Sequence, residues 1–231
     1  MMKSLVVIPS RMGSSRFPGK PLCKIAGKEM ILHVCDRVAE GFDLVVATPD
    51  DEIKQVVKQA GYNVIMTDKN CPTGTDRVAE VSKDIKSEIY INVQGDEPLI
   101  LIKDIKNVLN CKEICYNKVV GSMTELLENN INVVKVFQCL NRLRILTRKG
   151  TAFYRQCGLY AFNKEELDLY YNIPYQEKIK SLERNENIEL MRFVELDYPV
   201  HMQIITGSPA VDIPEDIEKI LEVISNGRAE S

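Results

Sequence analysis

The sequence predicts an α/β fold in which helices cover both faces of a mostly parallel sheet. Short runs of consecutive apolar residues recur along the chain, as expected of strands that are buried on both faces. Between these runs, apolar residues return at helical spacing, which is typical of amphipathic helices. The 231 residues, 45% of them hydrophobic and 27% charged, are enough for one globular domain with a substantial core.

The N-terminal half shows this alternation most clearly. Strands are expected at 5–8, 44–47, 64–66 and 89–93, and helices over 31–38, 53–60, 78–85 and 102–109. Gly61 directly follows the second helical pattern and predicts its end, because glycine is common just past a helix C-terminus.

The C-terminal half is less regular. Strands are expected at 133–137, 158–162 and 202–205, and helices at about 164–171, 181–194 and 214–226. The stretches 111–135 and 138–156 show no clear period. Since there is no linker or internal repeat, we expect a single domain over 1–231, with a smaller subregion at about 111–156.

The overall charge and hydropathy exclude several classes of partner. A net charge of −3 argues against a nucleic-acid partner held by a general basic field. The apolar runs are too short to span a bilayer, and Pro9 and Arg11 interrupt the first run too early for a signal peptide. We therefore expect neither a nucleic-acid nor a membrane partner.

The cysteine pattern indicates a reducing compartment. Seven cysteines are scattered without a CxxC pair, and only His33 and His201 could join them as zinc ligands. This composition predicts a cytoplasmic protein with free thiols and neither a zinc site nor a catalytic cysteine.

A basic, glycine-containing segment follows the first expected strand. Residues 10–20 read SRMGSSRFPGK. Its glycines allow backbone N–H groups to approach a ligand closely, and Arg11, Arg16 and Lys20 supply positive charge. The segment matches neither GxxxxGK[ST] nor GxGxxG, so it predicts a phosphate site of another kind.

Two further polar segments belong to the same edge of the predicted sheet. NVQGDEP at 92–98 leaves a strand, and TGTDR at 73–77 opens a helix. Ligands of open α/β sheets bind outside the carboxyl ends of the strands. A phosphate site that faces the carboxylate of Asp96 predicts a bridging hard cation, most simply Mg²⁺.

Four segments together carry a family resemblance: PSRMGSSRFPGKPL, TGTDR, NVQGDEP and VDIPEDI, in this order. In this combination the chain resembles the 3-deoxy-manno-octulosonate cytidylyltransferases, or CMP-Kdo synthetases. The match is close over 4–100, patchy over 101–180 and recovers over 181–220. It implies a Rossmann-like three-layer sandwich with a mixed sheet, a homodimer formed through the smaller subregion, and a need for Mg²⁺. It also implies transfer of CMP from CTP to the anomeric hydroxyl of an acidic sugar, with release of pyrophosphate.

The resemblance assigns roles to individual residues. It implies that Arg11, Ser14, Arg16 and Lys20 hold the CTP phosphates, and that Thr75 and Arg77 lie against the cytidine. It implies that Asp96 and Asp212 bind magnesium and, with Arg11 and Lys20, form the catalytic set. It implies that Gln94, Arg148, Gln156, Glu189 and Arg192 face the sugar acid.

The residues themselves leave simpler roles open. Asp96 could cap the turn before Pro98, and Asp212 could cap a helix that begins near Pro214. Arg148 and Arg192 could lie along the surface with solvated ends. Glu189 could be one of several solvated glutamates on a helical face, and the two histidines are expected to be structural.

Some positions depart from the family pattern. The family carries a histidine in an Arg-His-Leu-Gly stretch, where this chain has Gln156. The loop that precedes this stretch is shortened to 149–154, and the region around 121–135 is trimmed. Three alternatives therefore stay open: another acidic sugar such as a nonulosonic acid, a donor nucleotide other than CTP, or a nucleotide-binding pseudoenzyme.

Overall fold

The computed structural model describes residues 2–14, 16–127, 133–173 and 188–229. A central nine-stranded sheet organises them, in the order β5-β4-β1-β6-β10-β7-β11-β9-β8. The strands are β1 (Ser4–Pro9), β4 (Leu44–Thr48), β5 (Val64–Met66), β6 (Ile89–Val93), β7 (Val119–Glu125), β8 (Lys135–Cys139), β9 (Arg142–Thr147), β10 (Tyr154–Phe162) and β11 (Val200–Ile204). A separate small hairpin joins β2 (Lys24–Ile25) to β3 (Lys28–Glu29).

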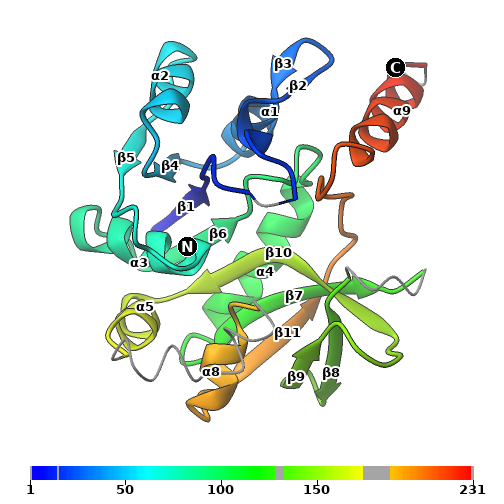
Figure 1. The fold of residues 1–231 in the computed structure, drawn as a ribbon. Helices are drawn as coiled ribbons and strands as arrows, with labels where there is room; N and C mark the ends of the chain where they lie inside the picture. Colours follow the sequence, from blue (N-terminus) through cyan, green and yellow to red (C-terminus); the bar gives the residue numbers. More distant parts are fainter. Residues whose placement is uncertain (1, 15, 128–132, 174–187, 230–231) are drawn as a thin grey trace.

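The two halves of the sheet differ in strand direction. Strands β5, β4, β1 and β6 are parallel to one another. Strand β10 then runs antiparallel between β6 and β7, and the β8–β9 hairpin pairs antiparallel with both β10 and β11 (Figure 1). The sheet is thus mixed, and its N-terminal part has the predicted parallel arrangement.

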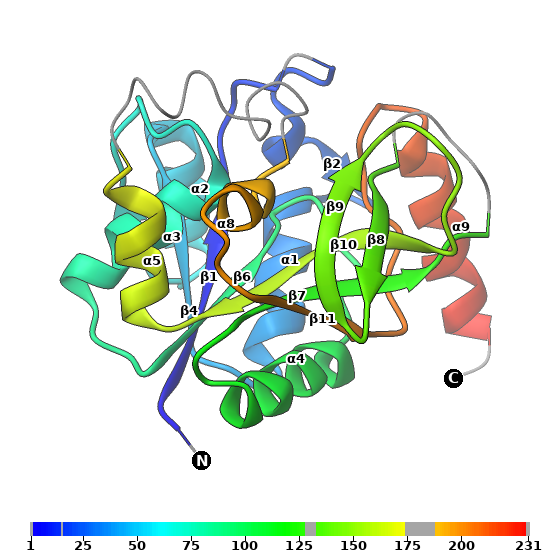
Figure 2. The same ribbon diagram turned by 90° about the horizontal axis from the view of Figure 1, so that it is seen from below.

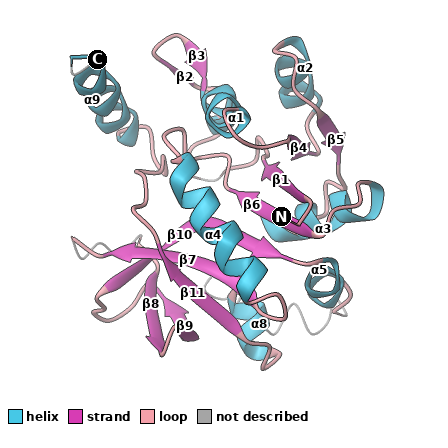
Figure 3. Ribbon diagram, turned by 180° about the vertical axis from the view of Figure 1, so that it is seen from behind, coloured by secondary structure: helices cyan, strands magenta, loops and turns pink. Residues whose placement is uncertain are grey.

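Helices form a layer on each face of the sheet. One face is covered by α1 (Met30–Ala39), α2 (Asp51–Gln59) and α4 (Ile102–Ile114). The other is covered by α3 (Gly74–Asp84), α5 (Lys164–Tyr171) and α8 (Met191–Glu195). Figure 2 shows α5 and α8 on the side of the sheet away from α4, and Figure 3 shows α4 lying across the strands. The predicted α/β sandwich is confirmed.

The alternation of side chains along β1 explains its continuous apolar sequence. Leu5 and Val7 belong to the core beneath α3 and α5, whereas Val6 and Ile8 belong to the core beneath α1 and α4. Successive residues of a strand point to opposite faces, so a strand covered on both sides needs apolar residues throughout. Its carboxyl end therefore emerges from the core at a fixed place, directly before the basic segment.

A third, smaller core lies beside the carboxyl end of β1. It contains Ile25, Met30, Leu99, Val211 and Ile220, and so joins the β2–β3 hairpin, the start of α1 and helix α9 (Asp216–Ala229). A short 3-10 helix, η1 (Lys20–Leu22), leads into this region. This packing brings the segment around Val211 next to the basic loop.

The region 111–156 differs from the expectation in its details. Helix α4 extends to Ile114, and two strands that the sequence did not predict, β7 and β9, lie in the main sheet. The first half of the helix expected at 181–194 lies outside the described residues, and α8 covers its last part. Among the described helices, none is both long and apolar enough to cross a bilayer.

Candidate active site

A polar cleft of about 380 Å³ opens at the carboxyl ends of β1 and β6. The three segments that the sequence singled out meet there, as expected. Its lining is Pro9, Ser10, Arg11, Gly13, Ser14, Arg16, Lys20, Pro21, Met30, Pro72, Thr73, Gly74, Arg77, Gln94, Gly95, Asp96 and Glu189. The Oγ of Ser10 is buried and has no hydrogen-bond partner among the described residues, so it can bond to a ligand.

Local hydrogen bonds shape the basic loop that forms one wall of the cleft. The backbone N–H of Met12 donates to Asp50 Oδ2 over 2.7 Å, and that of Gly19 donates to Met12 O over 3.2 Å. Gly19 has a φ of 73°, a left-handed conformation that favours glycine. Ser14 Oγ accepts the N–H of Phe17 over 3.3 Å.

Two cations of this loop pair with the two carboxylates predicted to bind metal. Lys20 Nζ lies 2.6 Å from Asp96 Oδ2, and it also donates to the backbone O of Val211 over 2.8 Å. Arg16 Nη2 lies 3.0 Å from Asp212 Oδ1. The N–H of Val211 donates to Asp96 O over 2.9 Å, so the segments that carry the two aspartates are directly joined.

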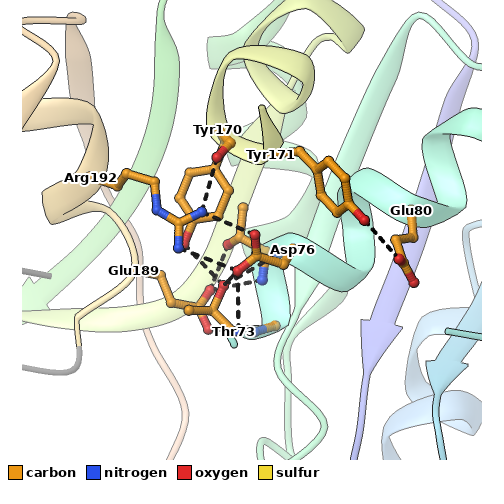
Figure 4. A network of polar contacts seen from close by, with 9 residues as sticks. Thr73, Asp76, Glu80, Tyr170, Tyr171, Glu189 and Arg192 are labelled. Carbon is orange, nitrogen blue, oxygen red and sulfur yellow. Dashed lines mark hydrogen bonds and ion pairs between the residues drawn. The ribbon is translucent and has the colours of Figure 1, made fainter. Parts of the chain in front are cut away.

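The opposite wall is the N-terminus of α3, and a capping box fixes it. Thr73 Oγ1 accepts the N–H of Asp76 over 3.2 Å, and Asp76 Oδ2 accepts the N–H of Thr73 over 3.2 Å. Glu189 adds a second carboxylate to the same helix end. It accepts the N–H groups of Gly74 and Thr75 over 2.9 and 3.1 Å and the Thr75 hydroxyl over 2.5 Å (Figure 4). Negative charge at this end also suits the helix dipole.

Arg192 contacts Asp76, the carboxylate that caps this helix end. Its guanidinium is 3% exposed, donates to Asp76 Oδ1 over 3.0 Å and to Tyr170 O over 3.0 Å, and lies 3.5 Å from the centre of the Tyr170 ring. Figure 4 shows Arg192 and Tyr170 side by side next to Asp76. Arg192 is not part of the cleft lining, so the predicted sugar contact gains no support from its position.

Arg77 lines the cleft but is almost fully buried. Its Nη1 donates to Thr67 Oγ1 and Asp68 O, and its Nη2 donates to Cys71 O. Burial lowers the pKa of Arg77. Arg77 therefore holds the 67–71 loop beside the cleft, and Thr75 is likewise buried and bonded to Glu189.

Of the other residues predicted to contact the sugar, some line the cleft and some do not. Gln94 lines the cleft together with Glu189. Gln156, on β10, donates through Nε2 to the hydroxyl of buried Tyr160 over 2.7 Å and is not part of the lining. Arg148 follows β9, where its backbone O accepts from Lys135 Nζ over 2.8 Å, and it also lies outside the lining. The cleft thus brings together two of the five predicted sugar residues.

The sequence reasoning missed Glu97, which follows Asp96 in the chain but is not part of the cleft lining. This carboxyl is 4% exposed and accepts the N–H of Gly158 over 2.7 Å and the hydroxyl of Ser208 over 3.2 Å. Burial, together with the neighbouring Asp96, raises the pKa of Glu97 to about 7. Its place within NVQGDEP, directly after Asp96, was the available signal.

The described residues contain no group of three or more His, Cys, Asp or Glu side chains that could hold a metal ion by themselves. Asp96 lines the cleft, whereas Asp212 is not part of the lining and is linked to it through its ion pair with Arg16 and the backbone bond between Val211 and Asp96. The side chains of Asp96 and Asp212 are 26% and 39% exposed. A pair of accessible carboxylates is what Mg²⁺ uses when substrate phosphates supply further oxygen ligands.

Comparison with known protein families decides the identity of the chain. A model of the cytidylyltransferase family matches residues 5–223. The chain belongs to this family. Similar relatives include the 3-deoxy-manno-octulosonate cytidylyltransferase 2 of Hydrogenovibrio crunogenus, which is 34% identical, with 98% of this chain and 100% of the relative covered. The 3-deoxy-manno-octulosonate cytidylyltransferase of Escherichia coli is 31% identical over the whole of both chains.

Solved structures agree with this assignment. The cytidylyltransferase superposes on a CMP:2-keto-3-deoxy-manno-octonic acid synthetase complexed with CTP at a TM-score of 0.87, with 30% identity, 97% of this chain and 99% of the other covered. A 4-diphosphocytidyl-2C-methyl-D-erythritol synthase from Anaerococcus prevotii shares the fold alone, at 16% identity and a TM-score of 0.65, with 97% and 99% covered. The protein is therefore a nucleotidyltransferase.

Proposed function

We propose that this cytidylyltransferase transfers CMP from CTP to the anomeric hydroxyl of Kdo or a closely related 3-deoxy sugar acid. The hydroxyl oxygen forms a bond to the α-phosphorus of CTP and releases its proton. The bond from that phosphorus to the α–β bridging oxygen breaks, and pyrophosphate leaves with the electron pair. The names of the full-length relatives and of the CTP-bound structure support this reaction.

The basic loop supports the phosphate side of the proposal. Arg11, Arg16 and Lys20 line one wall of the cleft, together with Gly13 and Ser14. Cationic side chains and accessible backbone amides neutralise and orient a triphosphate. Phosphoryl-type transfer needs mainly alignment and charge stabilisation from the protein, so these groups are suited to catalysis as well as binding.

We assign Asp96 and Asp212 to a divalent cation, most simply Mg²⁺. The two carboxylates fit this ion because they are accessible, lie on segments joined by a backbone hydrogen bond, and each pair with a cation of the phosphate loop. When bound, Mg²⁺ would polarise the α-phosphate and neutralise charge on the leaving pyrophosphate. The chain itself holds the two carboxylates next to the loop cations, so it fixes where the phosphates lie.

The wall formed by the N-terminus of α3 is assigned to the nucleoside. Pro72, Thr73 and Gly74 contribute to this wall, and Arg77 fixes the loop beside it. Gln94 and the half-buried Glu189 also line the cleft, where their polar groups can contact the hydroxyls of a sugar acid.

One observation carries the proposal: three loop cations and two carboxylates from distant segments meet at one sheet edge. Titration calorimetry with CTP, UTP and CMP, with and without Mg²⁺, tests the assigned ligand. We expect CTP to bind more tightly than UTP and CMP, and Mg²⁺ to strengthen CTP binding. Mass spectrometry after addition of Kdo should then detect the CMP–sugar. Equal affinity for all three nucleotides would contradict the proposal.

We also infer a homodimer. Large apolar side chains are exposed on and beside the β8–β9 hairpin and β11: Leu140, Ile145, Phe153 and Ile204. Strands β9 and β11 are neighbours in the sheet, so several of these side chains share one region. Exposed apolar groups of this kind are common at subunit contacts. Sedimentation velocity should show a dimer that Ile145→Asp weakens.

A further inference from the structure

We propose that Glu97 is a positioning residue, which holds the segments of Asp96 and Asp212 in one fixed arrangement. The inference rests on the proposed function, because it concerns the two carboxylates assigned to the divalent cation. Glu97 follows Asp96 directly in the chain, yet it is buried and is absent from the lining of the cleft. It therefore acts through other residues.

The two oxygens of Glu97 join three segments of the chain. Oε1 accepts the N–H of Gly158 on β10 over 2.7 Å, and Oε2 accepts the hydroxyl of Ser208 over 3.2 Å. Ser208 belongs to the segment that runs from β11 to Asp212. The same carboxyl thus connects the loop after β6 with β10 on one side and with the Asp212 segment on the other.

Backbone hydrogen bonds lie on both sides of this connection. The N–H of Gln94 donates to Gly158 O over 3.0 Å, and the N–H of Val211 donates to Asp96 O over 2.9 Å. Each bond from Glu97 therefore stands beside a backbone bond between the same two segments. Together the four contacts fix the loop that carries Asp96 relative to the segment that carries Asp212.

The space around Gly158 shows how tightly this arrangement is packed. A Cβ at Gly158 would lie 2.5 Å from Gln94 Cγ and 2.7 Å from Glu97 Oε1. Neither distance is possible for a real side chain, so the contact requires glycine here. The close approach allows the Glu97 carboxyl to reach the Gly158 N–H.

Asp104 holds the other end of the same segment. Its carboxylate, at the start of α4, accepts the N–H groups of Thr206 and Gly207 over 3.0 and 2.9 Å. Without Glu97, the segment would keep this attachment but would lose the side-chain contact at Ser208. We therefore expect the segment to stay folded while the spacing of the two candidate metal carboxylates becomes variable.

The test compares the affinity for CTP in EDTA with that in Mg²⁺, measured by titration calorimetry on the full-length protein. The ratio of the two dissociation constants reports the contribution of the metal alone, since a general loss of folding affects both. In the wild type we expect Mg²⁺ to tighten CTP binding. Glu97→Ala should reduce this ratio by about 10-fold to 100-fold, as is typical for residues that orient metal ligands, with affinity in EDTA nearly unchanged.

Glu97→Gln is the conservative variant. Its amide oxygen can accept the Gly158 N–H and its NH₂ can donate to Ser208, so both contacts survive without the charge. We expect its ratio to stay close to that of the wild type. Val108→Ala truncates a buried side chain of α4 and serves as the matched control: its melting temperature should fall, with the ratio unchanged.

Each outcome has a distinct meaning. If Glu97→Ala keeps the wild-type ratio, or if Val108→Ala loses it equally, the positioning role is overturned. If Glu97→Ala does not fold, Ser208→Ala removes one of the two contacts and should lower the ratio by about fivefold; an unchanged ratio would overturn the proposal. A wild type that shows no effect of Mg²⁺ would instead contradict the metal assignment within the proposed function.

Discussion

Lys20 and Asp96, 76 residues apart in the sequence, form an ion pair with Nζ 2.6 Å from Oδ2. Arg16 and Asp212 form a second pair of the same kind. In both pairs a cation assigned to phosphates neutralises a carboxylate assigned to metal. A metal–triphosphate complex carries both kinds of charge, so we expect each partner to exchange its neighbour for the matching part of the ligand.

The first prediction concerns Asp96→Asn. This change removes the charge that the assigned metal needs, while it leaves Lys20 available for phosphate. We expect turnover to fall by a factor of about 100 or more, because metal ligation contributes several kcal/mol to charge stabilisation. Binding of CTP without Mg²⁺ should persist. Pyrophosphate release and titration calorimetry check both parts, and near-normal activity at moderate Mg²⁺ would remove Asp96 from the site.

The second prediction concerns Arg16→Ala and Lys20→Ala. Each change should weaken the binding of CTP much more than that of CMP, because both side chains are assigned to the distal phosphates. A charge-assisted hydrogen bond contributes about 1.5–3 kcal/mol. Lys54→Ala on the outer face of α2 is the control, since its exposed pair with Asp51 lies outside the cleft lining. Equal losses for CTP and CMP would mean that the loop supports the fold or contacts the nucleoside.

The third prediction separates two roles of Glu189. As the second carboxylate at the N-terminus of α3, Glu189 should support both stability and the nucleoside wall. Glu189→Ala should therefore lower the melting temperature and weaken CTP binding, with a loss of about 0.5–2 kcal/mol in stability, as for other helix caps. A change in KM for the sugar alone, with CTP affinity and melting temperature unaffected, would make it a sugar contact only.

The fourth prediction uses the pKa of Glu97, which burial raises from 4.5 to about 7. At pH values between 4.5 and about 7, Glu97 is protonated in the folded protein and ionised in the unfolded chain. The contribution of Glu97 to stability is therefore greatest at low pH and declines as pH rises toward 7. Urea unfolding of the wild type and Glu97→Gln should show a difference in unfolding free energy that falls by on the order of 3 kcal/mol across this window. A constant difference would contradict the raised pKa.

The N-terminal half of the fold could be predicted because the residues that indicate each helix or strand lie within it or directly beside it in the sequence. The run Leu5–Ile8 is apolar throughout since both faces of β1 are buried, and Gly61 ends its helix with a positive φ of 88°. Such signals depend on a few neighbouring residues.

The strands that were missed depend on distant contacts. In β7, Gly121 interrupts the apolar pattern because a Cβ there would lie 2.8 Å from Leu190 Cδ1 and from Met202 Sδ. In β9, buried Leu143 and Leu146 are separated by exposed residues, so no simple period appears. Neither cause can be read from the local sequence.

The residues of the candidate site also fall into two groups: those that could be located from the sequence and those whose roles depend on distant contacts. The basic loop and NVQGDEP could be located because strand ends of an α/β sheet converge. Arg192 could not be distinguished from a ligand-binding arginine, because its partner Asp76 is 116 residues away. The same holds for Arg77, whose buried contacts with the 67–71 loop are made only in the folded chain.

The central claim is CMP transfer to a 3-deoxy sugar acid, and one measurement tests it most directly. Pyrophosphate release is followed with CTP, Mg²⁺ and a panel of acceptors: Kdo, a nonulosonic acid, and a neutral hexose as control. The account predicts stoichiometric pyrophosphate and CMP–sugar with Kdo or a close relative, dependence on CTP and Mg²⁺, and none with the hexose. Tight binding of CTP without pyrophosphate release for any sugar acid would contradict it.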